Sequence, residues 1–262
     1  MRLRIEVDLN YTLERAADVL LQVEVAALPD QRIVSEALTL WSDVPVRAVA
    51  GEDGVGQRCW VHTEGRMCAS YRGIVDVSRE PVTLADYAAT PVRMHDGALV
   101  PYLLASRYCQ ADRFVGFVER DFAGLTGGAL ASALVDWVQN ALRYRPNVSD
   151  GSTTALDTFA TRSGVCRDYA HLLVALARAG GIPARCVSAY APGVEPPDFH
   201  AVAELWLEGA WRLVDATGMA SCSDLARVCV GRDATDIAFM TIFGEAQLVS
   251  QSVRVVQERA PD

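Results

Sequence analysis

The periodicity of the apolar residues changes once along this chain, and that change limits the folds the chain can adopt. Before residue 80, apolar and polar residues alternate in stretches such as Leu3–Leu9, Val19–Val25 and Ile74–Val77. This alternation is typical of strands with one buried face, because successive side chains point to opposite sides of a strand. Later, Ala129–Leu142 carries its apolar residues at steps of three and four, the spacing of an amphipathic helix. The sequence therefore predicts an α+β fold in which the strands come first.

Turn-forming residues divide the β-rich region into short strands. Asp53-Gly54 predicts one turn, and Glu64-Gly65 predicts a hairpin between Arg58–Thr63 and Arg66–Tyr71. Several short antiparallel strands at this spacing favour a β-sandwich. The periodicity then fades from Pro81 to Pro101, where prolines interrupt the chain. We expect an N-terminal antiparallel β-sandwich domain over residues 1–105 and a second domain over residues 106–262.

The charged residues exclude several classes of function. The chain has 24 Lys+Arg and 33 Asp+Glu, which gives a net charge of −9. This balance disfavours nucleic acids and anionic membranes as partners. All 24 basic residues are arginines. Chemistry that needs a lysine, such as Schiff-base formation or phosphate binding by a P-loop lysine, is therefore excluded.

Two further features bear on the compartment. The sequence contains no run of about 18 uncharged apolar residues, which a membrane-spanning helix requires. The alternation in Met1–Leu9 predicts a strand and not an export signal. The seven cysteines form no CxxC pair and are typical of free thiols in a reducing compartment. We therefore expect a cytoplasmic protein.

A predicted helix after Ser163 carries a cysteine in its first turn. Ser163 is the expected N-cap, and Gly180-Gly181 is the expected end of this largely apolar helix. Cys166 would then lie where unpaired backbone N–H groups and the helix dipole favour a thiolate over a thiol. A lone cysteine in an apolar helix is also commonly a small core residue. The nucleophile interpretation therefore depends on the residues downstream.

A histidine and an aspartate follow on two predicted strands. A two-residue turn at Glu208-Gly209 pairs strand His200–Leu207 with strand Trp211–Asp215. Asp215 then lies on the same face as His200 at a diagonal position, within reach of the imidazole. A cysteine nucleophile, a histidine proton shuttle and a carboxylate that orients the imidazole are the groups that thiol catalysis needs. The sequence predicts a triad of Cys166, His200 and Asp215.

These residues stand in four motifs, which are, in chain order, Gly164-Val165-Cys166-Arg167-Asp168-Tyr169-Ala170-His171-Leu172, Gly181-Ile182-Pro183-Ala184-Arg185, Asp198-Phe199-His200-Ala201 and Leu213-Val214-Asp215-Ala216-Thr217. The motifs resemble those of the transglutaminase-like superfamily, in particular its bacterial transglutaminase-like cysteine proteases. The resemblance implies a papain-like core over about residues 110–225, preceded by a β-sandwich. It also implies Cys166 as nucleophile, His200 as general acid and base, and Asp215 as the orienting group.

The oxyanion hole is assigned only in part. The resemblance implies the backbone N–H of Cys166 as the first donor, and no motif identifies the second, for which Tyr144 and Asn147 are the candidates. No cofactor is expected. A metal is not expected either, because Cys166, His200, Asp198 and Asp215 lack the paired spacing of structural metal sites. His171 lies five residues after Cys166 on the helix, rotated by about 140°, and is predicted to be structural.

The predicted function is cleavage of an amide or peptide bond through a thioester on Cys166, with a peptide or protein amide as substrate. Water is the expected acyl acceptor. One alternative is transamidation, in which an amine accepts the acyl group. Another is a catalytically silent protein-interaction module with the same fold, which has no physical need for an intact Cys/His/Asp set. The sequence leaves the oligomeric state open.

Overall fold

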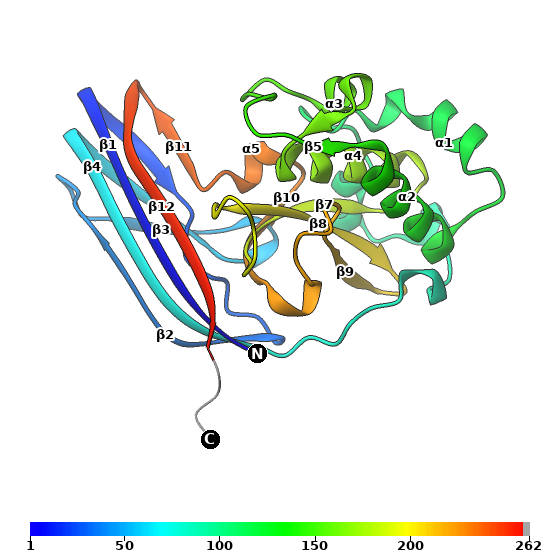
Figure 1. Cartoon of the computed structure of the whole chain (residues 1–262), viewed down its shortest axis with the longest axis horizontal. Coiled ribbons are helices and arrows are strands. Elements are labelled where there is room, and N and C mark those ends of the chain that lie inside the picture. Colours follow the sequence, from blue (N-terminus) through cyan, green and yellow to red (C-terminus); the bar gives the residue numbers. More distant parts are fainter. Residues whose placement is uncertain (259–262) are drawn as a thin grey trace.

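A computed structural model describes residues 1–258 of the chain. One large antiparallel sheet stands beside a unit of helices packed on a second sheet (Figure 1). The predicted α+β class is confirmed. The large sheet contains six strands: β1 (Arg2–Leu21), β2 (Gln31–Leu40), β3 (Arg47–Ala50), β4 (Gln57–Val77), β11 (Met240–Phe243) and β12 (Ala246–Glu258). β1 and β4 pair at its centre, β11 and β12 pair with the other edge of β1, and β2 and β3 pair with the other edge of β4.

The N-terminal strands form one sheet and not the predicted sandwich of two facing sheets. The apolar face of β1 and β4 is covered instead by the rest of the molecule. The Tyr71 ring stacks on Tyr190 of the second sheet, with ring centroids 6.3 Å apart. The Tyr190 hydroxyl donates to the Val23 carbonyl at 2.7 Å, and the Val25 N–H donates to the Tyr71 hydroxyl at 3.1 Å. Because these contacts bury the apolar face, a second facing sheet is not needed.

The predicted hairpin at Glu64-Gly65 is wrong, because β4 runs through this position as one strand. Its buried positions keep the same parity from Cys59 to Val77, as a continuous strand requires. β1 is likewise one strand and not two, with a bulge between Leu13 and Ala17. Pairing along the whole length of β1 therefore overrides the local turn signal.

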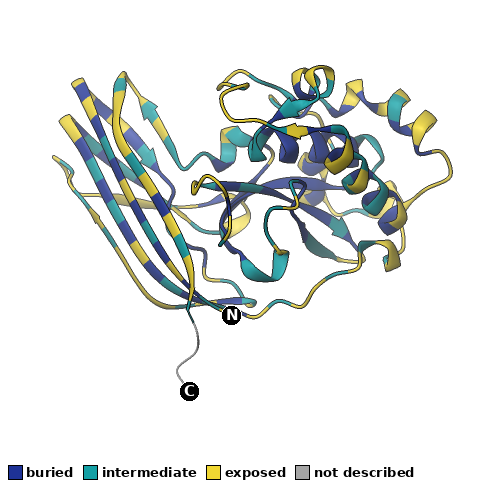
Figure 2. Ribbon diagram, viewed as in Figure 1, coloured by how far each residue is buried: buried dark blue, intermediate teal, exposed yellow. Residues whose placement is uncertain are grey.

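The second sheet has the strand order β10-β7-β8-β9. Its strands are β7 (Ala184–Tyr190), β8 (His200–Leu207), β9 (Ala210–Val214) and β10 (Ala226–Gly231). The helices are α1 (Val115–Asp121), α2 (Gly127–Ala141), α3 (Ala155–Thr161), α4 (Cys166–Ala179) and α5 (Ala234–Ile237), and a short bridge joins β5 (Arg143–Tyr144) to β6 (Ser163–Gly164). α4 is buried along most of its length (Figure 2). The predicted helix at 129–142 is confirmed as α2, and the predicted hairpin after His200 is confirmed as β8 and β9.

Short 3-10 turns make up much of the link between the large sheet and α1: Leu84–Asp86, Val92–Met94, Gly97–Tyr102 and Ala111–Arg113. Two further 3-10 turns lie at Glu52–Gly54 and Cys222–Asp224. The predicted domain boundary near residue 105 stays a prediction. In the described range, no helix combines the length and the apolar character needed to cross a membrane.

Candidate active site

Cys166 is the first residue of α4 and is half-buried. The helix is capped differently from the prediction. Ser163 lies in β6. The residue directly before the helix is Val165, so Ser163 is not the N-cap. The fully buried Asp168 holds the helix start instead, because its Oδ2 accepts the Val165 N–H at 2.9 Å. Cys166 therefore keeps its place in the first turn, where backbone N–H groups face a developing anion.

Tyr144 reaches Cys166 through the bridge between β5 and β6. The register places Tyr144 opposite Gly164, and the Arg145 N–H donates to the Gly164 carbonyl at 3.0 Å. Burial and the neighbouring Cys166 sulfur together raise the pKa of Tyr144 to about 12, although a hydrogen bond from the Cys166 backbone acts in the opposite direction. Tyr144 is therefore the predicted candidate whose surroundings include Cys166. Asn147, the other predicted candidate, is exposed, and no hydrogen bond joins it to Cys166 among the described residues.

His200 and Asp215 form a buried pair at the adjoining ends of β8 and β9. His200 Nε2 lies 3.0 Å from Asp215 Oδ2. Asp215 Oδ1 also accepts the Thr217 N–H at 2.8 Å and its hydroxyl at 2.7 Å, and Oδ2 accepts the Ala220 N–H at 2.9 Å. These donors fix the carboxylate, and the carboxylate in turn fixes the imidazole.

His200 and Asp215 shift each other's pKa in opposite directions. Burial lowers the pKa of His200, but the hydrogen bond to Asp215 and the effect of the neighbouring Cys166 sulfur outweigh it and raise that pKa to about 9. Burial acts to raise the pKa of Asp215, but other effects outweigh burial and lower this pKa below its ordinary value. The hydrogen bond with His200 is the largest of them. At neutral pH the couple is therefore an imidazolium and a carboxylate.

Cys166 lies beside the segment that carries His200. The backbone carbonyl of Phe199, next to His200, lies 3.9 Å from Cys166 Sγ. His200 is 1% exposed, and its Nδ1 has no hydrogen-bond partner within residues 1–258. Because Nε2 is taken by Asp215, Nδ1 is the nitrogen left for the thiol.

A second group of cysteine and histidine side chains lies inside the core. The sulfur atoms of Cys109 and Cys186 and one ring nitrogen of His171 lie within 4.8 Å of one another. His171 Nε2 accepts the Ala234 N–H at 3.0 Å, so in the neutral ring Nδ1 carries the proton and neither nitrogen offers a free lone pair. Burial lowers the pKa of His171 to about 4, and the hydrogen bond with Cys109, together with burial, raises the pKa of Cys186. The group fits neutral core side chains and not a metal site.

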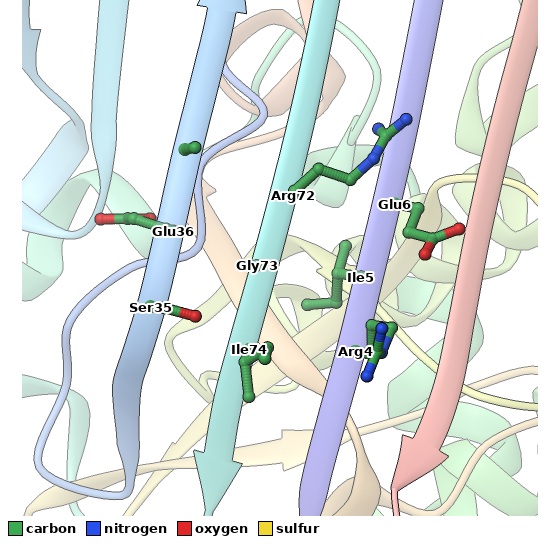
Figure 3. Close-up of a pocket in the computed structure, with 9 residues that line it drawn as sticks. Arg4, Ile5, Glu6, Ser35, Glu36, Arg72, Gly73 and Ile74 are labelled. Atoms are coloured by element: carbon green, nitrogen blue, oxygen red, sulfur yellow. The ribbon is translucent and has the colours of Figure 1, made fainter.

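A shallow hollow of about 330 Å³ lies elsewhere, on the face of the large sheet that points away from the helices (Figure 3). Arg4, Glu6, Ser35, Arg72 and Ile74 are among the residues that line it. None of the predicted site residues is among them. The hollow therefore carries none of the chemistry of the candidate site.

Comparisons with known proteins identify the family of the chain. The family described as the transglutaminase-like superfamily matches residues 121–216. A solved structure from Cytophaga hutchinsonii, described as a candidate cysteine protease, is 30% identical with a TM-score of 0.89, covering 100% of this chain and 93% of that chain. An uncharacterised protein of Mycobacterium leprae, ML0607, is 32% identical over 115 residues, which are 40% of this chain and 41% of that protein.

A more distant match is the periplasmic domain of TgpA from Pseudomonas aeruginosa, bound to ethylmercury. It is 20% identical with a TM-score of 0.38, covering 84% of this chain and 90% of that chain. The family match and the Cytophaga structure support a cysteine-dependent enzyme at the level of the family. The identity to the Cytophaga protein, sustained over nearly its whole length, shows that this chain belongs to the transglutaminase-like superfamily.

Proposed function

We propose that the protein is a thiol-dependent acyl-transfer enzyme that cleaves an amide or peptide bond through a thioester on Cys166. The orientation of His200 carries this proposal. Its Nε2 is bound to Asp215 at 3.0 Å, and its Nδ1 has no other partner in the described part of the chain. A buried imidazole nitrogen without a partner is costly unless it serves a reacting group. The Cys166 thiol is the group beside it.

In the proposed mechanism, His200 is the imidazolium whose Nδ1 holds the proton given up by the Cys166 thiol, and the thiolate attacks the carbonyl carbon of the substrate. The carbonyl π electrons move to oxygen and return when the carbon–nitrogen bond breaks. Nδ1–H of His200 gives its proton to the leaving amine, and a thioester on Cys166 remains. A water that loses a proton to Nδ1 then attacks the thioester, and the carboxylic acid and the thiol are released. Asp215 keeps the imidazole in the required orientation throughout.

The proposed oxyanion hole has two donors, the backbone N–H of Cys166 and the hydroxyl of Tyr144. The effects of the Cys166 sulfur and backbone on the pKa of Tyr144, which reaches about 12, support this assignment. A phenol with so high a pKa stays protonated at neutral pH and can donate to an oxyanion. Water is the proposed acceptor of the acyl group, and an amine in its place would give the transamidase alternative. The cytoplasmic location stays a prediction from the cysteine content.

The experiment that tests the proposal is limited iodoacetamide labelling at about pH 6, where ordinary thiols are slow to react, with each cysteine followed by peptide mass spectrometry. We expect Cys166 to label much faster than Cys222, which is also half-buried but whose pKa burial raises to about 11. His200→Ala should remove the advantage of Cys166, because the imidazolium that stabilises its thiolate is lost.

The matched control is His62→Ala. It removes a histidine–aspartate pair on the large sheet, in which His62 Nδ1 lies 2.8 Å from Asp18 Oδ1. This variant should leave the labelling of Cys166 unchanged. If Cys166 reacts no faster than Cys222 in the wild type, the nucleophile assignment is wrong and the interaction-module alternative takes its place. If Cys166 labels fast, the enzyme is incubated with peptides in the presence and absence of amines. A free acid as product shows hydrolysis, and a new amide shows transamidation.

A further inference from the structure

The loop that leads into β8 carries an exposed carboxylate one residue before the backbone carbonyl that lies beside the thiol. Asp198 precedes Phe199, and the Phe199 carbonyl oxygen lies 3.9 Å from Cys166 Sγ. Asp198 itself is exposed, whereas His200 two residues later is buried. The same short segment therefore presents a carboxylate to solvent and a backbone carbonyl to the thiol.

The large sheet holds this carboxylate in place. Asp198 Oδ1 accepts the Phe199 N–H at 2.8 Å and Gln251 Nε2 of β12 at 2.8 Å. Gln251 Oε1 accepts in turn from the Tyr11 hydroxyl of β1 at 3.4 Å. Oδ2 of Asp198 has no hydrogen bond from the described residues, and no arginine among them pairs with it. The carboxylate is thus fixed on one side, while its charge stays uncompensated on the other.

The charge of Asp198 acts on two tyrosines that belong to different parts of the molecule. The charge of Asp198 raises the pKa of Tyr11 on β1, where only burial has a larger effect. It also adds to burial and to the effect of Cys166 in raising the pKa of Tyr144 on β5. Tyr11 belongs to the large sheet and Tyr144 to the helical unit. The negative charge of Asp198 is therefore felt by residues of both parts of the molecule.

We propose that Asp198, fixed by Gln251, is a specificity-determining residue that selects peptide substrates with a basic side chain next to the reacting amide. The inference rests on the proposed function of Cys166 and deepens it by naming the substrate class. A fixed and unpaired carboxylate gains a charge-assisted hydrogen bond from an arginine or lysine side chain with little cost of reorganisation. A neutral side chain at the same place gains nothing comparable.

The test uses methanethiosulfonate reagents of similar size that carry a trimethylammonium, a sulfonate or a neutral ethyl group. We measure the rate at which each reagent modifies Cys166 and take the ratio of the rate with the cationic reagent to the rate with the anionic reagent. This ratio does not depend on the absolute reactivity of the thiol. Asp198→Asn keeps an oxygen acceptor for Phe199 and Gln251 and removes only the charge. We expect it to lower this ratio about tenfold at low salt, and the wild-type ratio to fall similarly in about 1 M salt.

Two variants complete this first arm. Asp198→Glu retains the charge and should keep the ratio within about twofold of the wild type. Glu119→Gln removes one exposed carboxylate from α1, at the other end of the molecule from the large sheet (Figure 1), and should leave the ratio unchanged. This control separates the local charge of Asp198 from the net charge of −9.

A second experiment tests whether the cation that Asp198 favours can be a basic side chain of a peptide. Two peptide chloromethyl ketones are compared, one with arginine and one with citrulline, which has nearly the same shape and no charge. The arginine reagent should alkylate Cys166 faster in the wild type and about equally in Asp198→Asn. An unchanged methanethiosulfonate ratio in Asp198→Asn overturns the subsite, and equal alkylation by both ketones in the wild type overturns the basic side chain. A slow reaction with the neutral ethyl reagent, by contrast, counts against the proposed function alone.

Discussion

Two buried histidines show how the surroundings of one residue type decide its charge. His200 has its pKa raised to about 9, because the hydrogen bond to Asp215 and the effect of the Cys166 sulfur outweigh burial. His171 has its pKa lowered to about 4, because burial dominates and its Nε2 accepts a backbone N–H. The first histidine is charged at neutral pH and lies beside the thiol. The second is neutral, stacks on Tyr108 at a ring-centroid distance of 5.1 Å, and belongs to the core.

The neutral state of His171 predicts an acid-sensitive fold. Its folded pKa of about 4 lies below the ordinary value of 6.5, so the unfolded chain binds more protons between these two pH values. We therefore expect its contribution to the free energy of unfolding to fall as the pH drops from 6.5 to about 4. Urea unfolding across this range should show a weaker dependence on pH for His171→Gln, whose amide oxygen can still accept the Ala234 N–H. An equal dependence in both proteins contradicts the assignment.

Tyr144 gives a prediction that separates nucleophile activation from oxyanion stabilisation. Tyr144→Phe removes the proposed second donor and should lower amide turnover by about 10²-fold to 10³-fold. Labelling of Cys166 by iodoacetamide forms no oxyanion and should stay fast in the same variant. Tyr102→Phe is the control, because the Tyr102 hydroxyl bonds to Asp53 at 2.6 Å, outside the candidate site. Loss of both labelling and turnover in Tyr144→Phe shows that Tyr144 acts on the thiol instead.

At the scale of the elements, the start of α4 depends on a close approach between β6 and the first turn of the helix. A Cβ atom at Gly164 would come within 2.6 Å of Asp168 Cβ and 2.8 Å of its Oδ2. The Asp168 carboxylate would have to leave the Val165 N–H that it accepts at 2.9 Å. Gly164 is therefore required by the cap, and the cap positions Cys166.

Gly164→Ala tests this dependence. We expect it to lower the free energy of unfolding by about 1–3 kcal/mol, through loss of the cap and overpacking. Gly151→Ala adds the same methyl group where no other atom lies within 4 Å, and should change stability by less than about 0.5 kcal/mol. Chemical denaturation of the two variants in parallel measures the difference. Equal midpoints show that Asp168 can move aside without cost.

At the scale of the whole molecule, a buried ion-pair network joins the two sheets. Glu204 on β8 is fully buried and receives Arg185 of β7 at 2.7 Å and Arg227 of β10 at 2.6 Å. Arg185 also pairs with Asp53 at 2.7 Å, and Arg227 pairs with Asp30. Both aspartates belong to the N-terminal part of the chain. Glu204 thus compensates two arginines that link the large sheet to the second sheet.

Glu204→Gln should therefore be strongly destabilising, because it removes the buried carboxylate shared by two guanidinium groups, which keep only the more exposed carboxylates of Asp53 and Asp30. The expected loss is about 3–5 kcal/mol in the free energy of unfolding. Asp8→Asn, which breaks the exposed pair with Arg72 at 2.9 Å, should cost no more than about 1 kcal/mol. Thermal and urea unfolding of both variants measure the contrast. A small effect at Glu204 would show that water or rearranged acids replace its charge.

Local signals in the sequence account for a substantial part of the fold. The hairpin of β8 and β9 is predictable because its turn residues, Glu208 and Gly209, have φ of 48° and 76°, as the two-residue turn requires. That hairpin brings His200 to Asp215, so the closeness of this pair is predictable too. α2 follows from its helical periodicity. The roles of Cys166, His200 and Asp215 remain the proposal tested above.

The sequence by itself determined the elements whose cause is local: the helices with their periodicity, the turn between β8 and β9, and the chain order of the cysteine, histidine and aspartate. Only the tertiary structure decided that β4 runs straight through Gly65, that β12 pairs with β1, and that Asp168 caps α4. It also decided that Tyr144 lies beside Cys166 and that Gln251 fixes Asp198. These contacts join residues far apart in the chain or replace one local cap by another. The free energy of the long-range contacts comes from burial and pairing that no short window of sequence contains.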